Sequence, residues 1–179
     1  MSPMIITGLF AVLGCFIYVC YFSYLISKYG IPNGGLCLLY YITNKGGESI
    51  IYCCIMSIIP FFVMPSYLYI SSVLYHSTLL FVLAIIALFC ASLMFVFPKY
   101  RESKIHNILA FFSRVLFLVW AIKTGDYVIL AIPLTAISLV VSSKLLRKRQ
   151  NIDRRFVFLT DFICYFSFII APLIIYTRF

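Results

Sequence analysis

Long apolar stretches separated by short polar segments dominate the chain. Residues 4–27 include no charged side chain, and about 20 apolar residues suffice for a helix to cross the hydrocarbon core of a bilayer. Similar stretches recur almost to the C-terminus. We therefore predict an all-α fold: a single polytopic transmembrane helical bundle without a soluble domain. Its six predicted spans cover roughly residues 4–27, 49–70, 78–97, 105–122, 127–143 and 156–177.

The connection between the first two spans, residues 28–48, is the longest. It contains the turn-forming sequence Pro32-Asn33-Gly34-Gly35, in which proline fixes φ and the following residues tolerate positive φ. Residues 36–42 are apolar but too few to cross a bilayer. We expect a folded loop over the helix ends, and an interfacial or re-entrant piece is the alternative.

Prolines and small residues inside the spans predict kinks and close helix contacts. Pro60, Pro65, Pro133 and Pro172 each remove a backbone donor from a predicted helix. Small residues share one face of the third span and one face of the fifth, and such faces allow helices to approach closely in lipid. They predict contacts inside the bundle, with a dimer face as the alternative. These residues are Ala84, Ala87 and Ala91, and Ala131, Thr135, Ser138 and Ser142.

Composition supports the membrane assignment. Hydrophobic residues make up 64% of the chain and charged residues 11%, whereas a soluble domain has about 25% charged residues. Six of the seven cysteines fall inside predicted spans, where a free cysteine behaves as a small buried hydrophobe. The two histidines, His76 and His106, are expected at opposite surfaces and solvated. We therefore predict no disulfide framework, no metal site and no cofactor.

The distribution of basic residues predicts the orientation in the cell membrane. Eleven Lys and Arg residues lie in the connections 28–48, 98–104 and 144–155, whereas the opposite side has only Lys123 and Arg178. Because cytoplasmic loops carry the excess of Lys and Arg, these three connections should be cytoplasmic and both termini outside. Tyr67, Tyr69 and Tyr75 then fit an aromatic belt at the outer interface.

The most basic connection is a candidate contact for anionic lipids at the cytoplasmic face, because such clusters attract anionic head groups. Topology alone also accounts for its charge, and this placement argues against nucleic acid as a partner. The candidate lipid-contact residues are Lys144, Arg147, Lys148, Arg149, Arg154 and Arg155.

Two charged residues lie at lipid depth and form the candidate binding site. Arg114 is expected near mid-bilayer, about 14 Å from the start of its span at 1.5 Å per residue, and Asp161 about 9 Å from the same side. Charges at this depth are costly and mark functional sites. We predict that they pair, and that His106 and Asn107 extend the site toward the cytoplasm. Alternatively, Arg114 extends to the interface and Asp161 accepts a hydrogen bond at a helix start.

Enzyme motifs are incomplete. Arg101 and His106 have the R-x4-H spacing of a class of helical ribonucleases, but no soluble helical domain surrounds them. The zinc site of ceramidase-like hydrolases needs three histidines, and this chain has two. Neither a G-x-S-x-G elbow nor an H-E-x-x-H motif occurs.

The Phe97-Pro98 pair, followed by His106-Asn107 and Ala110, resembles an uncharacterised family of bacterial six-pass membrane proteins. That family is related to the damage-regulated autophagy modulator family. Lys99-Tyr100 and Asn107 depart from its pattern, where an acidic residue and a glycine are usual. The resemblance implies a six-span fold and leaves the biochemical role open.

These observations leave three classes of function. The first is a non-enzymatic binding, regulatory or accessory membrane protein, with the lipid bilayer, another copy of the chain or a membrane protein as partner. The second is a small oligomeric transporter or channel. The third is an accessory protein of a bacterial defence system or an intramembrane enzyme.

Overall fold

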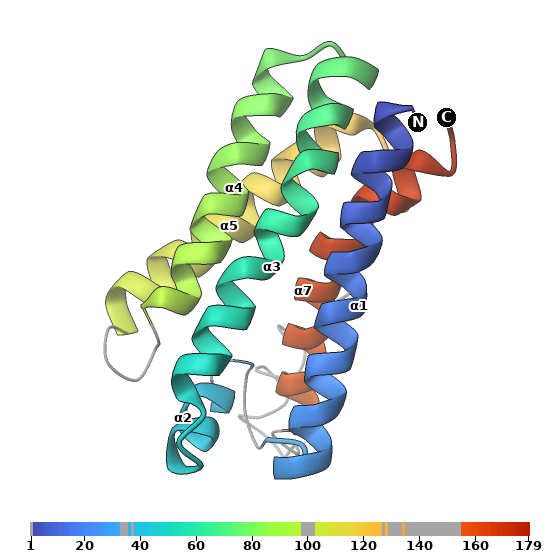
Figure 1. Ribbon diagram of the computed structural model, residues 1–179. Helices are drawn as coiled ribbons and strands as arrows, with labels where there is room; N and C mark the ends of the chain where they lie inside the picture. The colour runs from blue at the N-terminus through green and yellow to red at the C-terminus, as the bar shows by residue number, and fades with distance from the viewer. Residues whose placement is uncertain are drawn as a thin grey trace.

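The computed structural model describes residues 2–32, 36, 38–97, 103–126, 128, 134 and 155–179. These residues form helices throughout (Figure 1). The predicted span 127–143 lies outside the described residues. The elements are α1 (Pro3–Tyr29), α2 (Leu38–Lys45), α3 (Ser49–Tyr69), the π-helical continuation η1 (Ile70–Leu74), α4 (Thr78–Val96), α5 (Ser103–Thr124) and α7 (Arg155–Tyr176).

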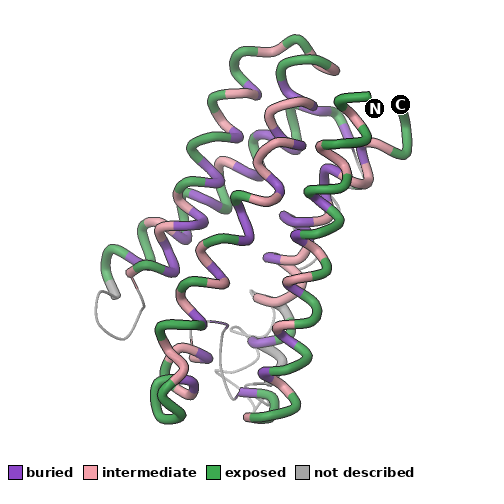
Figure 2. Tube along the Cα trace, in the orientation of Figure 1, coloured by how far each residue is buried: buried purple, intermediate pink, exposed green. Residues whose placement is uncertain are grey.

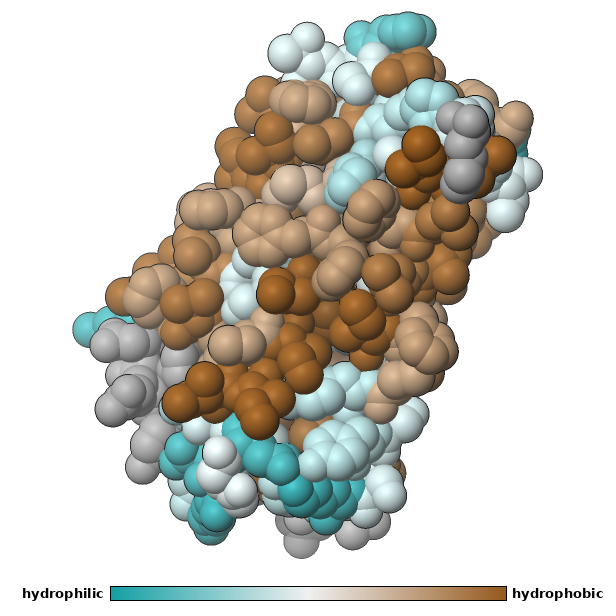
Figure 3. Space-filling model, viewed as in Figure 1, coloured by the Kyte–Doolittle hydropathy of each residue, from teal (hydrophilic) through white to brown (hydrophobic). Residues whose placement is uncertain are grey.

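The described residues include four helices that are long and apolar enough to cross a membrane. They are α1, α3 together with η1, α4, and residues Lys104–Thr124 of α5. The apolar part of α7, Asp161–Tyr176, is shorter. Apolar surface covers the middle of the molecule in Figure 3, and hydrophilic residues gather at the two ends. The chain is therefore a helical membrane bundle, as the sequence predicts.

The helices pack in the order α5, α4, α3, α1, α7, and α7 also contacts α3. The N- and C-termini lie at one end of the bundle, which we call the terminal end, and α2 lies at the other, the α2 end (Figure 1). Buried residues follow the inward faces of the helices (Figure 2). The predicted small-residue face of α4 is part of this core, since Ala84, Ala87 and Ala91 are all buried.

Residues 38–42 belong to the short helix α2 rather than to an irregular loop. Helix α2 packs against the start of α3 and buries Leu39 and Thr43. The Tyr52 hydroxyl of α3 donates a hydrogen bond to the Leu36 carbonyl at 3.0 Å. The described part of the connection therefore packs against the start of α3.

A charged cluster anchors the α2 end. Glu48, just before α3, pairs with Lys28 at the end of α1 and accepts hydrogen bonds from the hydroxyls of Tyr24 and Tyr29. The hydrogen bond from Lys28, followed by that from Tyr29, lowers the pKa of the Glu48 carboxyl. This cluster ties the end of α1 to the start of α3.

Tyr67 supplies a hydrogen bond that the backbone of the neighbouring helix α7 lacks. Pro172, inside α7, has no N–H for the Phe168 carbonyl one turn earlier. The Tyr67 hydroxyl of α3 donates to that carbonyl at 2.6 Å. The prediction that Tyr67 belongs to an interfacial aromatic belt is therefore wrong. The side chain is buried because the broken helix needs its hydroxyl.

A second hydrogen bond of this kind joins the same two helices, with the donor on α7 and the acceptor on α3. Pro60, inside α3, removes the donor for the Met56 carbonyl, and the Tyr165 hydroxyl of α7 donates to this carbonyl at 3.4 Å. Because lipid supplies no hydrogen bonds, each freed carbonyl must find a donor inside the protein. Two tyrosines, one from each helix, therefore cross-link α3 and α7.

This arrangement predicts a rescue. Tyr67→Phe should lower the free energy of unfolding by about 1–3 kcal/mol, because it leaves the Phe168 carbonyl buried without a donor. In a Pro172→Ala background the restored N–H bonds that carbonyl, so the same tyrosine change should cost much less. Thermal unfolding in one detergent measures both losses. Tyr69→Phe, at a half-buried tyrosine of the same helix, is the control, and equal losses of Tyr67→Phe in both backgrounds would contradict the assignment.

Candidate functional site

The candidate site is a cleft between α5 and α7. These two helices are not among the closely packed pairs, and side chains from α4, α5 and α7 line the space between them. The empty space between them is about 670 Å³, which includes space open to the surroundings. Its described lining is Leu36, Met94, Phe95, Ala110, Ser113, Arg114, Phe117, Leu118, Asp161, Cys164, Tyr165 and Phe168.

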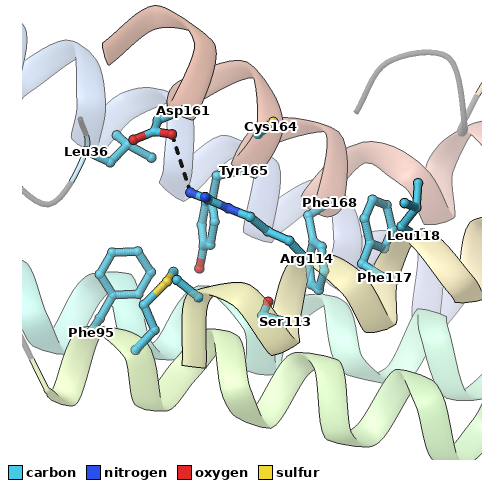
Figure 4. A pocket seen from close by; sticks show the side chains of 12 residues that line it. Leu36, Phe95, Ser113, Arg114, Phe117, Leu118, Asp161, Cys164, Tyr165 and Phe168 are labelled. Atoms are coloured by element: carbon cyan, nitrogen blue, oxygen red, sulfur yellow. Dashed lines mark hydrogen bonds and ion pairs between the residues drawn. The ribbon is translucent and has the colours of Figure 1, made fainter. Parts of the chain in front are cut away.

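The two predicted charges meet in this cleft. The Arg114 guanidinium of α5 reaches across to the Asp161 carboxylate of α7, with Nη2 and Oδ1 3.4 Å apart (Figure 4). The predicted pairing is therefore confirmed. Arg114 lies halfway along α5, and its side chain is 54% exposed, whereas that of Asp161 is 19% exposed. The pair thus places a separated positive and negative charge at mid-length of the bundle.

The contact is long for a charge-assisted hydrogen bond, which is about 2.7–2.9 Å between nitrogen and oxygen. It joins one guanidinium nitrogen to one carboxylate oxygen, although the two groups could form two parallel hydrogen bonds. The structure therefore shows a loosely joined pair. Arg114 has further N–H groups that can donate a hydrogen bond, and Asp161 has a further oxygen atom that can accept one.

Aromatic rings form the apolar wall beside the ion pair. Phe117 of α5 packs on Phe168 of α7 with ring centroids 4.4 Å apart. Phe95 of α4 meets Tyr165 of α7 edge to face at 5.4 Å. These ring pairs join α5 and α4 to α7 through side chains, although the backbones of α5 and α7 stay apart. The result is an apolar cleft with one charged pair, as Figure 4 shows.

His106 lies in the first turn of α5, and its ring contacts backbone carbonyls at the end of α4. Its Nδ1 is 2.7 Å from the Met94 carbonyl oxygen and 3.0 Å from that of Phe97. The proline at position 98 offers no N–H to the Met94 carbonyl, and the last carbonyls of a helix need donors from outside it. His106 is 2% exposed, so the expectation of a solvated histidine is wrong. Its ring is buried because it bonds the helix end.

The structure does not bring the whole predicted site together. Neither His106 nor Asn107 is among the described residues that line the cleft, and Asn107 is exposed. His106 contacts the backbone of Met94, which is one of the lining residues. The candidate lipid-contact residues 144–155 lie outside the described side chains, so that interpretation stays a prediction.

The ion pair at the terminal end was not predicted from the sequence. Arg178 contacts Asp126 at 3.1 Å, and Asp126 is only 3% exposed. Asp126 lies two residues after the end of α5 and also accepts a hydrogen bond from the Val128 N–H. The rarity of acidic residues was an available signal, because the chain has only five, and each of the three described ones pairs with a cation.

The ion pair predicts non-additive stability. Arg114→Leu or Asp161→Leu should each lower the free energy of unfolding by about 1–3 kcal/mol, since the remaining charge lacks its partner in a low-dielectric cleft. The double variant should lose less than the sum, and less than the worse single variant. Thermal unfolding in detergent measures all three. Strict additivity of the single losses would show that the two groups do not stabilise each other.

No protein-family model, curated protein or solved structure matches this chain. The resemblance to six-pass bacterial proteins therefore stays a prediction.

Proposed function

We propose that the chain is a multi-pass protein of the cell membrane, with its basic loops in the cytoplasm and both termini outside. The positions of the described charges support this: Lys28, Lys45 and Lys104 belong to helix ends at the α2 end, and Lys123 and Arg178 to those at the terminal end. Helices α5 and α7 both run from the α2 end to the terminal end (Figure 1). The apolar stretch 127–143 lies between them in the sequence, and one further crossing there supports the proposal of six.

Within this topology, we propose that the protein is a non-catalytic binding protein whose ligand occupies the cleft between α5 and α7. The observation that carries the proposal is the Arg114–Asp161 pair in an otherwise apolar, aromatic cleft. Small-molecule sites combine mostly apolar walls with a few convergent polar groups. Ionisable groups at membrane depth are expensive, and a functional role is the default explanation for them.

The lining favours binding over catalysis. Ser113 and Cys164 are the nucleophile-type side chains of the described lining, and the described lining includes no histidine. Both are therefore without a histidine base, which such nucleophiles commonly use for activation. The nearest described histidine, His106, is engaged with the carbonyls at the end of α4.

The transport alternative has less support. Transporters use broken helices whose freed carbonyls coordinate ions. Here the carbonyls freed by Pro60 and Pro172 accept hydrogen bonds from Tyr165 and Tyr67. At these two prolines the freed carbonyls are therefore bonded by side chains and are not left open for an ion.

The topology has a direct test. We expect a fusion of alkaline phosphatase at Phe179 to be active and one at Gln150 to be inactive, because the enzyme folds only outside the cytoplasm. Green fluorescent protein fusions at the same positions should give the reverse pattern. Activity at Gln150 with none at Phe179 would invert the proposed orientation.

The binding role predicts a molecule that remains bound after extraction. Native mass spectrometry of protein extracted with its surrounding lipid should show a bound small molecule. Leu118→Trp should abolish this adduct, because Leu118 lines the cleft and a larger side chain fills it. Leu116→Trp is the matched control, since Leu116 is a similarly half-buried leucine of α5 outside the described lining. An equal adduct in both folded variants would contradict the proposed site.

A further inference from the structure

The charge balance of the cleft restricts the ligand that it can hold. Arg114 and Asp161 together carry no net charge. A ligand with a charged head group would leave one uncompensated charge among the apolar and aromatic side chains, which is costly in a low-dielectric environment. A neutral head group avoids that cost.

The geometry of the pair further restricts the head group. The guanidinium is a donor with five N–H groups and the carboxylate is an acceptor with two oxygens, and one long contact joins them. Among the described residues, each is the other's one ion-pair and hydrogen-bond partner. A head group that accepts from Arg114 and donates to Asp161 can therefore bridge both side chains without breaking the pair.

The walls define the rest of the ligand. Phe95, Phe117 and Phe168 give the cleft an aromatic surface, and Met94 and Leu118 extend it with flexible apolar side chains. Such a surface suits a hydrocarbon chain, because its contacts are apolar and non-directional. The ion pair lies beside this wall (Figure 4), so head group and chain can bind together.

We propose, building on the binding role given above, that the ligand is a single-chain amphiphile with a neutral head group that both donates and accepts a hydrogen bond. A long-chain alcohol, a primary fatty amide and an undissociated fatty acid share this chemistry. A chain ester can only accept, and an alkylammonium or an alkylphosphonate brings a net charge.

Five probes with the same twelve-carbon chain test this proposal: dodecanol, dodecanamide, methyl dodecanoate, dodecyltrimethylammonium and dodecylphosphonate. Binding to the full chain in lipid nanodiscs is measured by displacement of a fluorescent alkyl probe. Dodecanol and dodecanamide should bind about tenfold more tightly than the ester, which corresponds to one hydrogen bond lost at a polar site. Both should also bind more tightly than the two charged probes. Dodecanoic acid is then added at low pH, where it is undissociated. Its affinity, compared with those of dodecanol and dodecanamide, distinguishes a fatty acid from an alcohol or an amide as the preferred ligand.

Variants separate the head-group site from the cleft. The neutral double variant Arg114→Leu/Asp161→Leu should still bind the alkyl probes but lose the preference for alcohol and amide over ester. Arg178→Leu breaks the ion pair with Asp126, which lies outside the cleft. This variant should leave the preference unchanged.

The outcomes distinguish this inference from the proposed function. Equal affinity for ester and alcohol, or tighter binding of a charged probe, overturns the neutral donor–acceptor assignment while leaving the cleft a binding site. Binding that is unchanged by Leu118→Trp, or no binding of any probe, overturns both.

Discussion

The bundle depends on one constraint: in lipid, every backbone donor and acceptor must be satisfied inside the protein. Prolines at positions 60, 98 and 172 each deprive a carbonyl of its helical partner. Side chains from other helices bond all three, with Tyr165 on Met56, His106 on Met94 and Tyr67 on Phe168. These hydrogen bonds cross between helices, so the repair of local defects also fixes which helices are neighbours. They join α3 to α7 and α4 to α5.

That arrangement leaves α5 and α7 held from opposite sides of the bundle. Helix α7 is fixed to α1 and α3, and α5 to α4, so their own backbones need not touch. Within the part of the chain that the structure describes, ring contacts such as Phe117 on Phe168 and the Arg114–Asp161 pair join them through side chains. A cleft results where two rigidly held helices face each other across a distance that side chains only partly fill.

Sequence periodicity and charge predicted the helices well, because a bilayer imposes length and apolarity on any segment that crosses it. The Arg114–Asp161 contact was also predictable, since a charge at depth needs a partner and few were available. The role of His106 was not, because the sequence does not show which helix end its ring reaches. Tyr67 was misassigned for a related reason: a tyrosine near a predicted interface suits either an aromatic belt or a buried hydrogen bond. The choice depends on Pro172, more than a hundred positions away.

Hydrogen bonding also connects the cleft with its proposed ligand. Hydrogen bonds at the proline breaks are short or enclosed between packed helices, and they hold the architecture. The Arg114–Asp161 contact differs, because it joins two charged groups beside open volume and uses one of the hydrogen bonds that they could form. A pair that served only to join α5 to α7 would gain from closing to the two parallel hydrogen bonds that its groups allow. The structure shows one long contact in their place, and the remaining donors and acceptors are what the proposed neutral amphiphile can use.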